Sequence, residues 1–230
     1  MSSILSIETS TSACSVALSH DGANVFEIAH TKEAKHITLL GGYVDQALSF
    51  AKEHDIKIDA VAVSSGPGSY TGLRIGVSMA KGICYALQIP LISIPTLELL
   101  CIPLLLQVED ADKARFIPML DARRMEIYTA VYDFALTPIE KTDARVIEEN
   151  CYKCYLDEGP VYFIGNGVEK CKKILEHPNA RFLSQNIPLA KWMHPLAERK
   201  LADNKTEDIA YFEPFYLKEF VATVSKKKLL

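Results

Sequence analysis

Two short segments of the chain combine residue types that bind anions in proteins. The first, Ile7-Glu8-Thr9-Ser10-Thr11, places a carboxylate and three hydroxyls at the expected junction of two β-strands. The second, residues 66–74, is rich in glycine and leads from an expected strand into an expected helix, whose first N–H groups could face an anion. An anion or a nucleotide at this place would contact Glu8, Thr9, Ser10, Ser69, Thr71 and Arg74.

Each segment also has a purely structural interpretation. Hydroxyl-rich turns are common where no ligand binds, so both interpretations stay open for the first segment. In the second segment no Lys-Ser or Lys-Thr pair follows a glycine, as it does in a P-loop. We therefore favour a tight turn and close helix packing as the role of these glycines.

The sequence gives little support for a metal site. Cys151 and Cys154 have the spacing of a metal knuckle, but a structural zinc site needs four ligands and no second paired motif exists. Coincidence explains this pair most simply, and its role stays open. No two of the six histidines have the HxxxH spacing that places two imidazoles on one helix face, so we expect no metal.

Composition and charge describe an ordinary globular protein. Of the 230 residues, 49% are hydrophobic and 23% are charged, and the net charge is -4. Because phosphate neutralisation dominates nucleic-acid binding, this balance predicts weak binding by the chain alone. The start lacks a basic region, and the apolar run from Leu99 to Leu106 is too short for a bilayer. We expect a cytoplasmic protein with reduced cysteines and no membrane contact.

The apolar patterns predict strands and helices that alternate around these segments. Residues 4–29 are expected to form three antiparallel strands, with a hairpin turn at Asp21-Gly22. Helices over 36–53 and 71–87 then alternate with short buried strands, an order typical of parallel strands with crossover helices. The second half repeats the pattern less regularly, with strands expected at 116–120, 126–132 and 161–165 and a helix at 168–175.

The same pattern divides the chain. The apolar signal lapses around residues 110–113, which predicts a boundary between a first subdomain, 1–109, and a degenerate second subdomain, 110–213. Residues 214–230 are expected to form a C-terminal segment and tail that pack back on the first subdomain. The predicted fold class is α/β, with the second half an eroded copy of the first.

Both long helices carry more apolar surface than one sheet face can cover. Along the second helix two apolar stripes flank a narrow polar line, whereas a helix on a sheet needs only one apolar stripe. The surplus predicts a second burial partner, with the second subdomain or the C-terminal segment as an alternative cover. The residues of the predicted partner interface are Leu40, Val44, Ala47, Leu48, Gly72, Ile75, Gly76, Met79 and Ile83.

Several of these segments together resemble one protein family. The opening, Ile4 to Ser10 with Ala13 to Leu18, and the loop from Gly66 to Gly76 are similar to the TsaB (YeaZ) family of tRNA threonylcarbamoyladenosine biosynthesis proteins. Further similar motifs are Pro95-Thr96-Leu97, Asp121-Ala122-Arg123, Glu126-Ile127-Tyr128 and Pro214-Phe215-Tyr216-Leu217-Lys218. The resemblance implies an actin-like, hexokinase-like (ASKHA) fold, a duplicated ribonuclease-H-like architecture whose second half is eroded.

The resemblance also implies a function. The chain would be a non-catalytic scaffold or activating subunit of the bacterial complex that transfers a threonylcarbamoyl group to the adenosine next to the anticodon of tRNAs. The implied partners are a TsaD-type catalytic subunit, a TsaE-type ATPase in a ternary complex, a second copy of the chain when it is alone, and tRNA indirectly through the complex. No cofactor is implied for the isolated chain, and ATP or ADP is implied only in the complex.

The catalytic sister family, of TsaD type, shares the opening and a related loop, but this chain departs from it. The chain is shorter, lacks the HxxxH metal ligands and keeps only a remnant of the glycine-rich adenosine loop, at Gly165-Asn166-Gly167. Two other classes stay open: a small actin-like ATPase or phosphotransferase, and an M22-like protease or chaperone-type binding module. Ala122 weakens the first, because a second phosphate hairpin needs glycine there. The protease would need the absent metal ligands.

Overall fold

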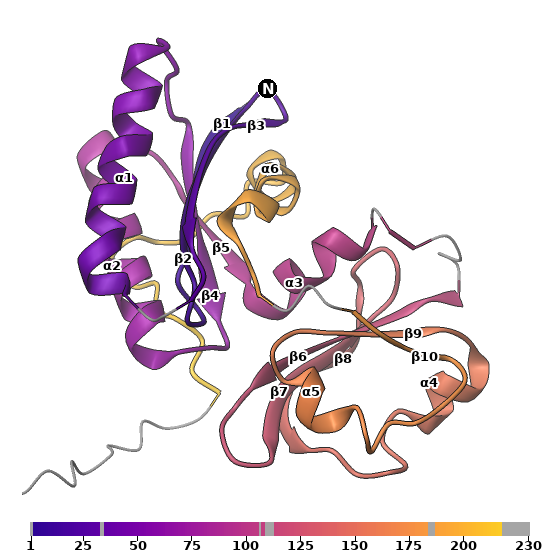
Figure 1. Cartoon of the computed structure of the whole chain (residues 1–230). Coiled ribbons are helices and arrows are strands. Elements are labelled where there is room, and N and C mark those ends of the chain that lie inside the picture. Colours follow the sequence, from indigo (N-terminus) through magenta and orange to yellow (C-terminus); the bar gives the residue numbers. More distant parts are fainter. Residues whose placement is uncertain (1, 33–34, 106, 109–112, 184–186, 218–230) are drawn as a thin grey trace, which may run out of the picture.

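The two halves of the chain form two sheets with the same strand order. The structure, a computed structural model, describes residues 2–32, 35–105, 107–108, 113–183 and 187–217. Each sheet has five strands, and the two sheets lie beside one another in the molecule (Figure 1). None of the helices in the described part of the chain is long and apolar enough to span a membrane.

The first sheet has the strand order β3-β2-β1-β4-β5. The first three strands pair antiparallel, whereas β4 runs parallel to both β1 and β5. The hairpin turn predicted at Asp21-Gly22 is confirmed, since both residues have positive φ angles. The strands are β1 (Ser3–Glu8), β2 (Cys14–His20), β3 (Ala23–His30), β4 (Ala60–Gly66) and β5 (Leu91–Pro95).

Helices cover both faces of the first sheet (Figure 1). Helices α1 (His36–Glu53) and α2 (Tyr70–Leu87) pack on the face to which Leu5 and Ile7 point. Helices α3 (Thr96–Leu105) and α6 (His194–Ala202) pack on the face of Ile4. Strand β1 is buried along its whole length, as expected of a central strand covered on both sides. The predicted helices over 36–53 and 71–87 are confirmed, the second with one more residue at its start.

The second sheet has the order β10-β9-β6-β7-β8. Read from its other edge, β8-β7-β6-β9-β10, it repeats the topology of the first sheet. Its strands β6, β7 and β8 again pair antiparallel, and β9 is again parallel to its two neighbours. The duplicated, actin-like fold predicted from the sequence is therefore confirmed. The elements are β6 (Arg115–Asp121), β7 (Glu126–Tyr132), β8 (Pro138–Val146), α4 (Lys153–Glu158), β9 (Val161–Ile164), α5 (Val168–Cys171) and β10 (Ala180–Phe182).

Two edge strands of the second sheet were not predicted. Strand β8 carries Lys141, Asp143 and Arg145, and none of its residues is fully buried. Such charged sequences are usual at sheet edges, where they oppose further pairing, but they give no apolar run to recognise. Strand β10 has only three residues. The helix predicted over 168–175 is shorter and ends at Cys171.

The last part of the chain returns to the first sheet through 3₁₀-helix η2 (Ala190–Trp192) and helix α6. The N–H of Ala190 donates to Ser15 Oγ at 2.9 Å, and Lys200 Nζ donates to the Ser93 carbonyl at 2.6 Å. The sequence-based second subdomain, 110–213, therefore extends too far, because residues after about 189 pack on the first sheet. Farther on, the N–H of Phe215 donates to the Ser65 carbonyl at 2.7 Å.

Candidate functional site

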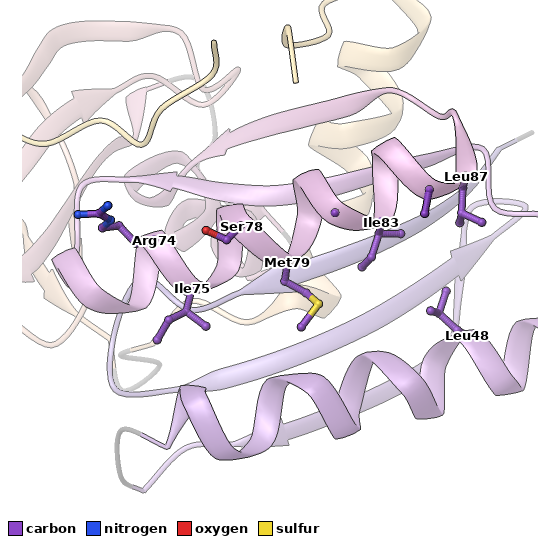
Figure 2. Close-up of a pocket in the computed structure, with 9 residues that line it drawn as sticks. Leu48, Arg74, Ile75, Ser78, Met79, Ile83 and Leu87 are labelled. Carbon is purple, nitrogen blue, oxygen red and sulfur yellow. The ribbon is translucent and has the colours of Figure 1, made fainter. Parts of the chain in front are cut away.

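An open apolar groove of about 690 Å³ lies along the side of helix α2 that faces helix α1 (Figure 2). Two of its lining residues, Arg74 and Ser78, are polar and the others are apolar. No described residue of the second sheet or of the segment 207–217 lines it. The lining residues are Leu48, Arg74, Ile75, Ser78, Met79, Gly82, Ile83, Ala86 and Leu87.

The groove exists because helix α2 has two apolar faces. Its residues Val77, Ala80 and Cys84 are buried against the sheet. The next face, with Ile75 and Met79, points toward helix α1 but is only partly covered by it (Figure 2). At the end of the groove Leu87 is 48% exposed. The structure thus leaves open the second apolar stripe that the sequence predicted.

Four of the nine predicted interface residues line this groove: Leu48, Ile75, Met79 and Ile83. Three predicted residues of helix α1 do not line the groove: Leu40, Val44 and Ala47. Their side chains are at most 4% exposed and form the core between α1 and the sheet. The sequence placed these three on the wrong face of the helix. They are not accessible to a partner.

Gly72 and Gly76 are also buried, so their place in the predicted partner interface is wrong. A Cβ atom at Gly72 would overlap the carbonyl oxygen of Thr9, and one at Gly76 would overlap the Thr9 hydroxyl. These glycines therefore let the turn between β1 and β2 dock on helix α2. Close packing was the structural role favoured for the glycine-rich loop.

The predicted anion-contacting residues mainly bind one another. Thr9 Oγ1 donates to the Gly72 carbonyl at 2.8 Å, and the N–H of Ser69 donates to the Ser10 carbonyl at 2.6 Å. Ser69 caps helix α2, since its Oγ accepts the N–H of Gly72 at 3.2 Å. The turn and the helix start are thus joined to each other, whereas Thr71 and Arg74 are exposed.

Glu8 lies beneath this turn and is fully buried. Its Oε1 accepts hydrogen bonds from the N–H and the hydroxyl of Ser10, while Oε2 has no partner among the described residues. Burial raises the pKa of Glu8 from an ordinary 4.5 to about 7, and the hydrogen bonds from Ser10 and Ser64 oppose this rise. A carboxyl group in this position holds the turn.

The corresponding turn of the second sheet is also filled by the chain itself. Lys170 Nζ donates to Asp121 Oδ1 at 2.6 Å and to the carbonyls of Arg124 and Glu126. A Cβ at Gly165 would overlap the Met119 carbonyl oxygen. The remnant glycine loop therefore packs on strand β6.

The cysteines and histidines of the described ranges do not converge. All six cysteines are free thiols, with Cys154 exposed and Cys151 half-buried. Cys151 Sγ accepts the N–H of Glu148 at 3.3 Å. In the part of the chain that the structure describes, no group of three His, Cys, Asp or Glu side chains could hold a metal ion.

The sequence missed the aromatic contact beside Arg74. The ring of Tyr216 lies 4.8 Å from the ring of Tyr70, and Arg74 Nη1 donates to Tyr70 Oη at 2.8 Å. Tyr70 and Arg74 are one helical turn apart, a spacing visible in the sequence. Tyr216 comes from the far end of the chain, and no local pattern indicates its contact.

Comparisons with known proteins agree on one group. The family model described as "TsaD: tRNA N6-adenosine threonylcarbamoyltransferase" matches residues 27–226. The Escherichia coli K12 protein named "tRNA threonylcarbamoyladenosine biosynthesis protein TsaB" is 29% identical over 95% of this chain and 96% of its own length. A solved structure, YeaZ from Pseudomonas aeruginosa, superposes with a TM-score of 0.80 and 26% identity over 94% of this chain and all of that one. A Carboxydothermus hydrogenoformans threonylcarbamoyltransferase is 36% identical over 41% of this chain and 33% of its own length.

Proposed function

The chain belongs to the family of that threonylcarbamoyltransferase model and, within it, to the TsaB (YeaZ) proteins, and from this premise we propose that it serves threonylcarbamoyladenosine synthesis on tRNA as a non-catalytic subunit. It acts as a scaffold that binds and activates a TsaD-type catalytic subunit. A TsaE-type ATPase joins the two in a ternary complex, and tRNA binds to the complex. The tRNA substrate supports a cytoplasmic location.

The groove along helix α2 is the observation that carries this proposal. An apolar strip that runs along a helix and is left open by the rest of the chain is a feature of protein interfaces. The TsaD model matches a range that includes helices α1 and α2. A TsaD-type subunit would therefore carry counterparts of both helices, and two such helix pairs could pack face to face and cover both apolar strips. When the chain is alone, a second copy can take that place.

The two turns at the carboxyl ends of β1 and β6 support a non-catalytic role. In an actin-like enzyme these turns approach the phosphates of a nucleotide. Here the N–H of Ser69 donates to the Ser10 carbonyl at the first turn, and Lys170 Nζ donates to Asp121 at the second. Two donors that could hold phosphate are therefore already bound within the chain. An ATP or ADP molecule is expected only where the complex supplies further groups.

Reconstitution with purified components tests the proposal. The chain, a TsaD-type subunit and a TsaE-type ATPase from the same organism are incubated with tRNA, ATP and threonylcarbamoyl-adenylate, and the modified nucleoside is measured by mass spectrometry. We expect no product from the chain alone and a strong loss of product when the chain is left out. Product from the chain alone, or an unchanged yield without it, would contradict the proposed role.

A further inference from the structure

Arg74 is a charged residue at the edge of an otherwise apolar groove. Figure 2 shows its side chain near the start of helix α2, reaching out on the side of the helix away from Ile75 and Met79. The guanidinium of a helical residue points toward the helix start, and here it reaches Tyr70 in the first turn. A partner that covers the groove would also reach this guanidinium.

Aromatic contacts hold the guanidinium in one place. Its central carbon lies 5.4 Å from the centre of the Tyr70 ring, and Tyr216 packs on the same ring at an angle of 41°. Tyr216 is fixed in turn, because Phe215 donates to the Ser65 carbonyl and its own carbonyl lies against Gly66. The side chain is therefore ordered before any partner binds, which reduces the entropic cost of association.

In the part of the chain that the structure describes, no carboxylate forms an ion pair with Arg74, and the carboxylate of Glu213 acts on the neighbouring Tyr216. The bond to Tyr70 uses one of the five N–H donors of the guanidinium. The first turn of helix α2 contains no acidic residue. By contrast, carboxylates face several other cations of the molecule, namely Arg145, Lys170, Lys191 and Arg199.

We propose that Arg74 determines partner specificity by pairing with an aspartate or glutamate of the catalytic subunit that covers the groove. This inference rests on the proposed function. The apolar strip supplies buried area, whereas a planar guanidinium that accepts a carboxylate through two parallel bonds fixes the alignment of the two helix pairs. Tyr70 and Tyr216 are positioning residues for Arg74. Arginine and tyrosine are among the residue types that dominate the binding energy of protein interfaces.

Calorimetric titration of the chain with the TsaD-type subunit tests this pairing. We expect Arg74→Ala to raise the dissociation constant about 30-fold and Arg74→Glu to raise it by more than about 100-fold. Arg74→Lys should recover only part of the affinity, because an ammonium lacks the two-bond geometry. Lys173→Glu in the second half is the matched control, since Lys173 is exposed, lies outside both long helices, and the variant changes the net charge by the same amount as Arg74→Glu. It should change affinity less than about 3-fold.

The role of Tyr216 is tested by two variants. Tyr216→Ala should weaken association about 5-fold through loss of the ring that holds Tyr70, whereas Tyr216→Phe, which keeps the ring, should bind like the wild type. Thermal melts check that every variant folds. Binding of Arg74→Ala within about 3-fold of the wild type would overturn the inference and leave the proposed function standing. Failure of the wild type to bind the catalytic subunit would overturn both.

A second titration separates a carboxylate from a phosphate as the anion. Pyrophosphate is added to the isolated chain and to the Arg74→Ala variant. We expect no saturable binding to either protein. Binding to the wild type that is lost in the variant would assign Arg74 to a phosphate-bearing ligand and overturn the pairing with a partner carboxylate.

Discussion

The two halves of this molecule share a strand order but differ in what covers their sheets. The first sheet carries two helices of 18 residues, α1 and α2, on one face. The corresponding elements of the second half, α4 and α5, have six and four residues. The short helices still complete a core with β6, β7 and β9. The long ones leave an apolar strip open.

This difference shows where a duplicated fold can keep a function. The strands of both halves are needed for stability, so both sheets persist. The crossover helices can shorten once they have only to close a core. We therefore attribute partner binding to the first half, where the helices exceed that need, and the predictions below test this division.

The largest expected effect is on partner binding, from a charge in the groove. Met79→Glu places a carboxylate in the apolar strip, where a partner would bury it without a counter-ion, so association with the TsaD-type subunit should weaken by about 100-fold or more. The matched control in the second half is Met125→Glu, at a methionine that is 56% exposed. Calorimetric titration should show nearly unchanged binding for this control. Equal losses for both variants would break the contrast between the halves.

Alanine replacements at two glycines of helix α2 should change stability in opposite directions, because Gly72 lies on the packed side of the helix and Gly82 on its open side. Gly72→Ala forces a methyl group onto the Thr9 carbonyl and should lower the free energy of unfolding by at least about 2 kcal/mol. Gly82→Ala adds a methyl group with no atom within 4 Å and should raise it by about 0.5–1 kcal/mol. Urea denaturation measures both. A stable Gly72→Ala protein would mean that the turn does not dock on the helix as described.

Glu8 should make the stability of the first half depend on pH. Because the folded chain holds the Glu8 proton more tightly than the unfolded chain, it binds more protons between pH 4.5 and 7, and the free energy of unfolding falls as pH rises through this range. Relative to Glu8→Gln, the wild type should lose about 2 kcal/mol between pH 5 and pH 8. Urea denaturation at several pH values measures this slope.

Asp121, at the end of β6, is the counterpart of Glu8 and serves as the control. It is exposed; partial burial raises its pKa, but the hydrogen bond from Lys170 and the other nearby groups outweigh this and lower the pKa overall. Asp121→Asn should therefore leave the slope between pH 5 and pH 8 as it is in the wild type. A slope that persists in Glu8→Gln would show that another group causes it.

The smallest expected effect concerns tRNA, because we expect neither half of the isolated chain to supply a tight tRNA-binding surface. With a net charge of -4, the isolated chain should bind tRNA with a dissociation constant weaker than about 1 µM at physiological salt. Replacing Arg123 and Arg124, the exposed pair in the turn of the second half, by alanine should then change little. Sub-micromolar binding that these two replacements abolish would assign a tRNA surface to the second half.

Much of the fold followed from local patterns in the sequence. The turn at Asp21-Gly22, the two long helices and the buried strands between them depend on residue types a few positions apart, which is the range that periodicity reports. The surplus of apolar residues on helix α2 was also visible in this way. The glycine-rich loop before this helix indicated close packing, and the contacts of Gly72 with Thr9 explain why.

The sequence alone could not decide which stripe of each helix faces the sheet. The rotation of helix α1 about its axis, which is set by packing on β2 and β3, buries Leu40 and Val44 and leaves Leu48 at the groove. The return of helix α6 to the first sheet and the contact of Tyr216 with Tyr70 join segments that are far apart in sequence. Local propensity carries no information on such pairs, because their contacts depend on chain topology and on the volume that other elements leave free.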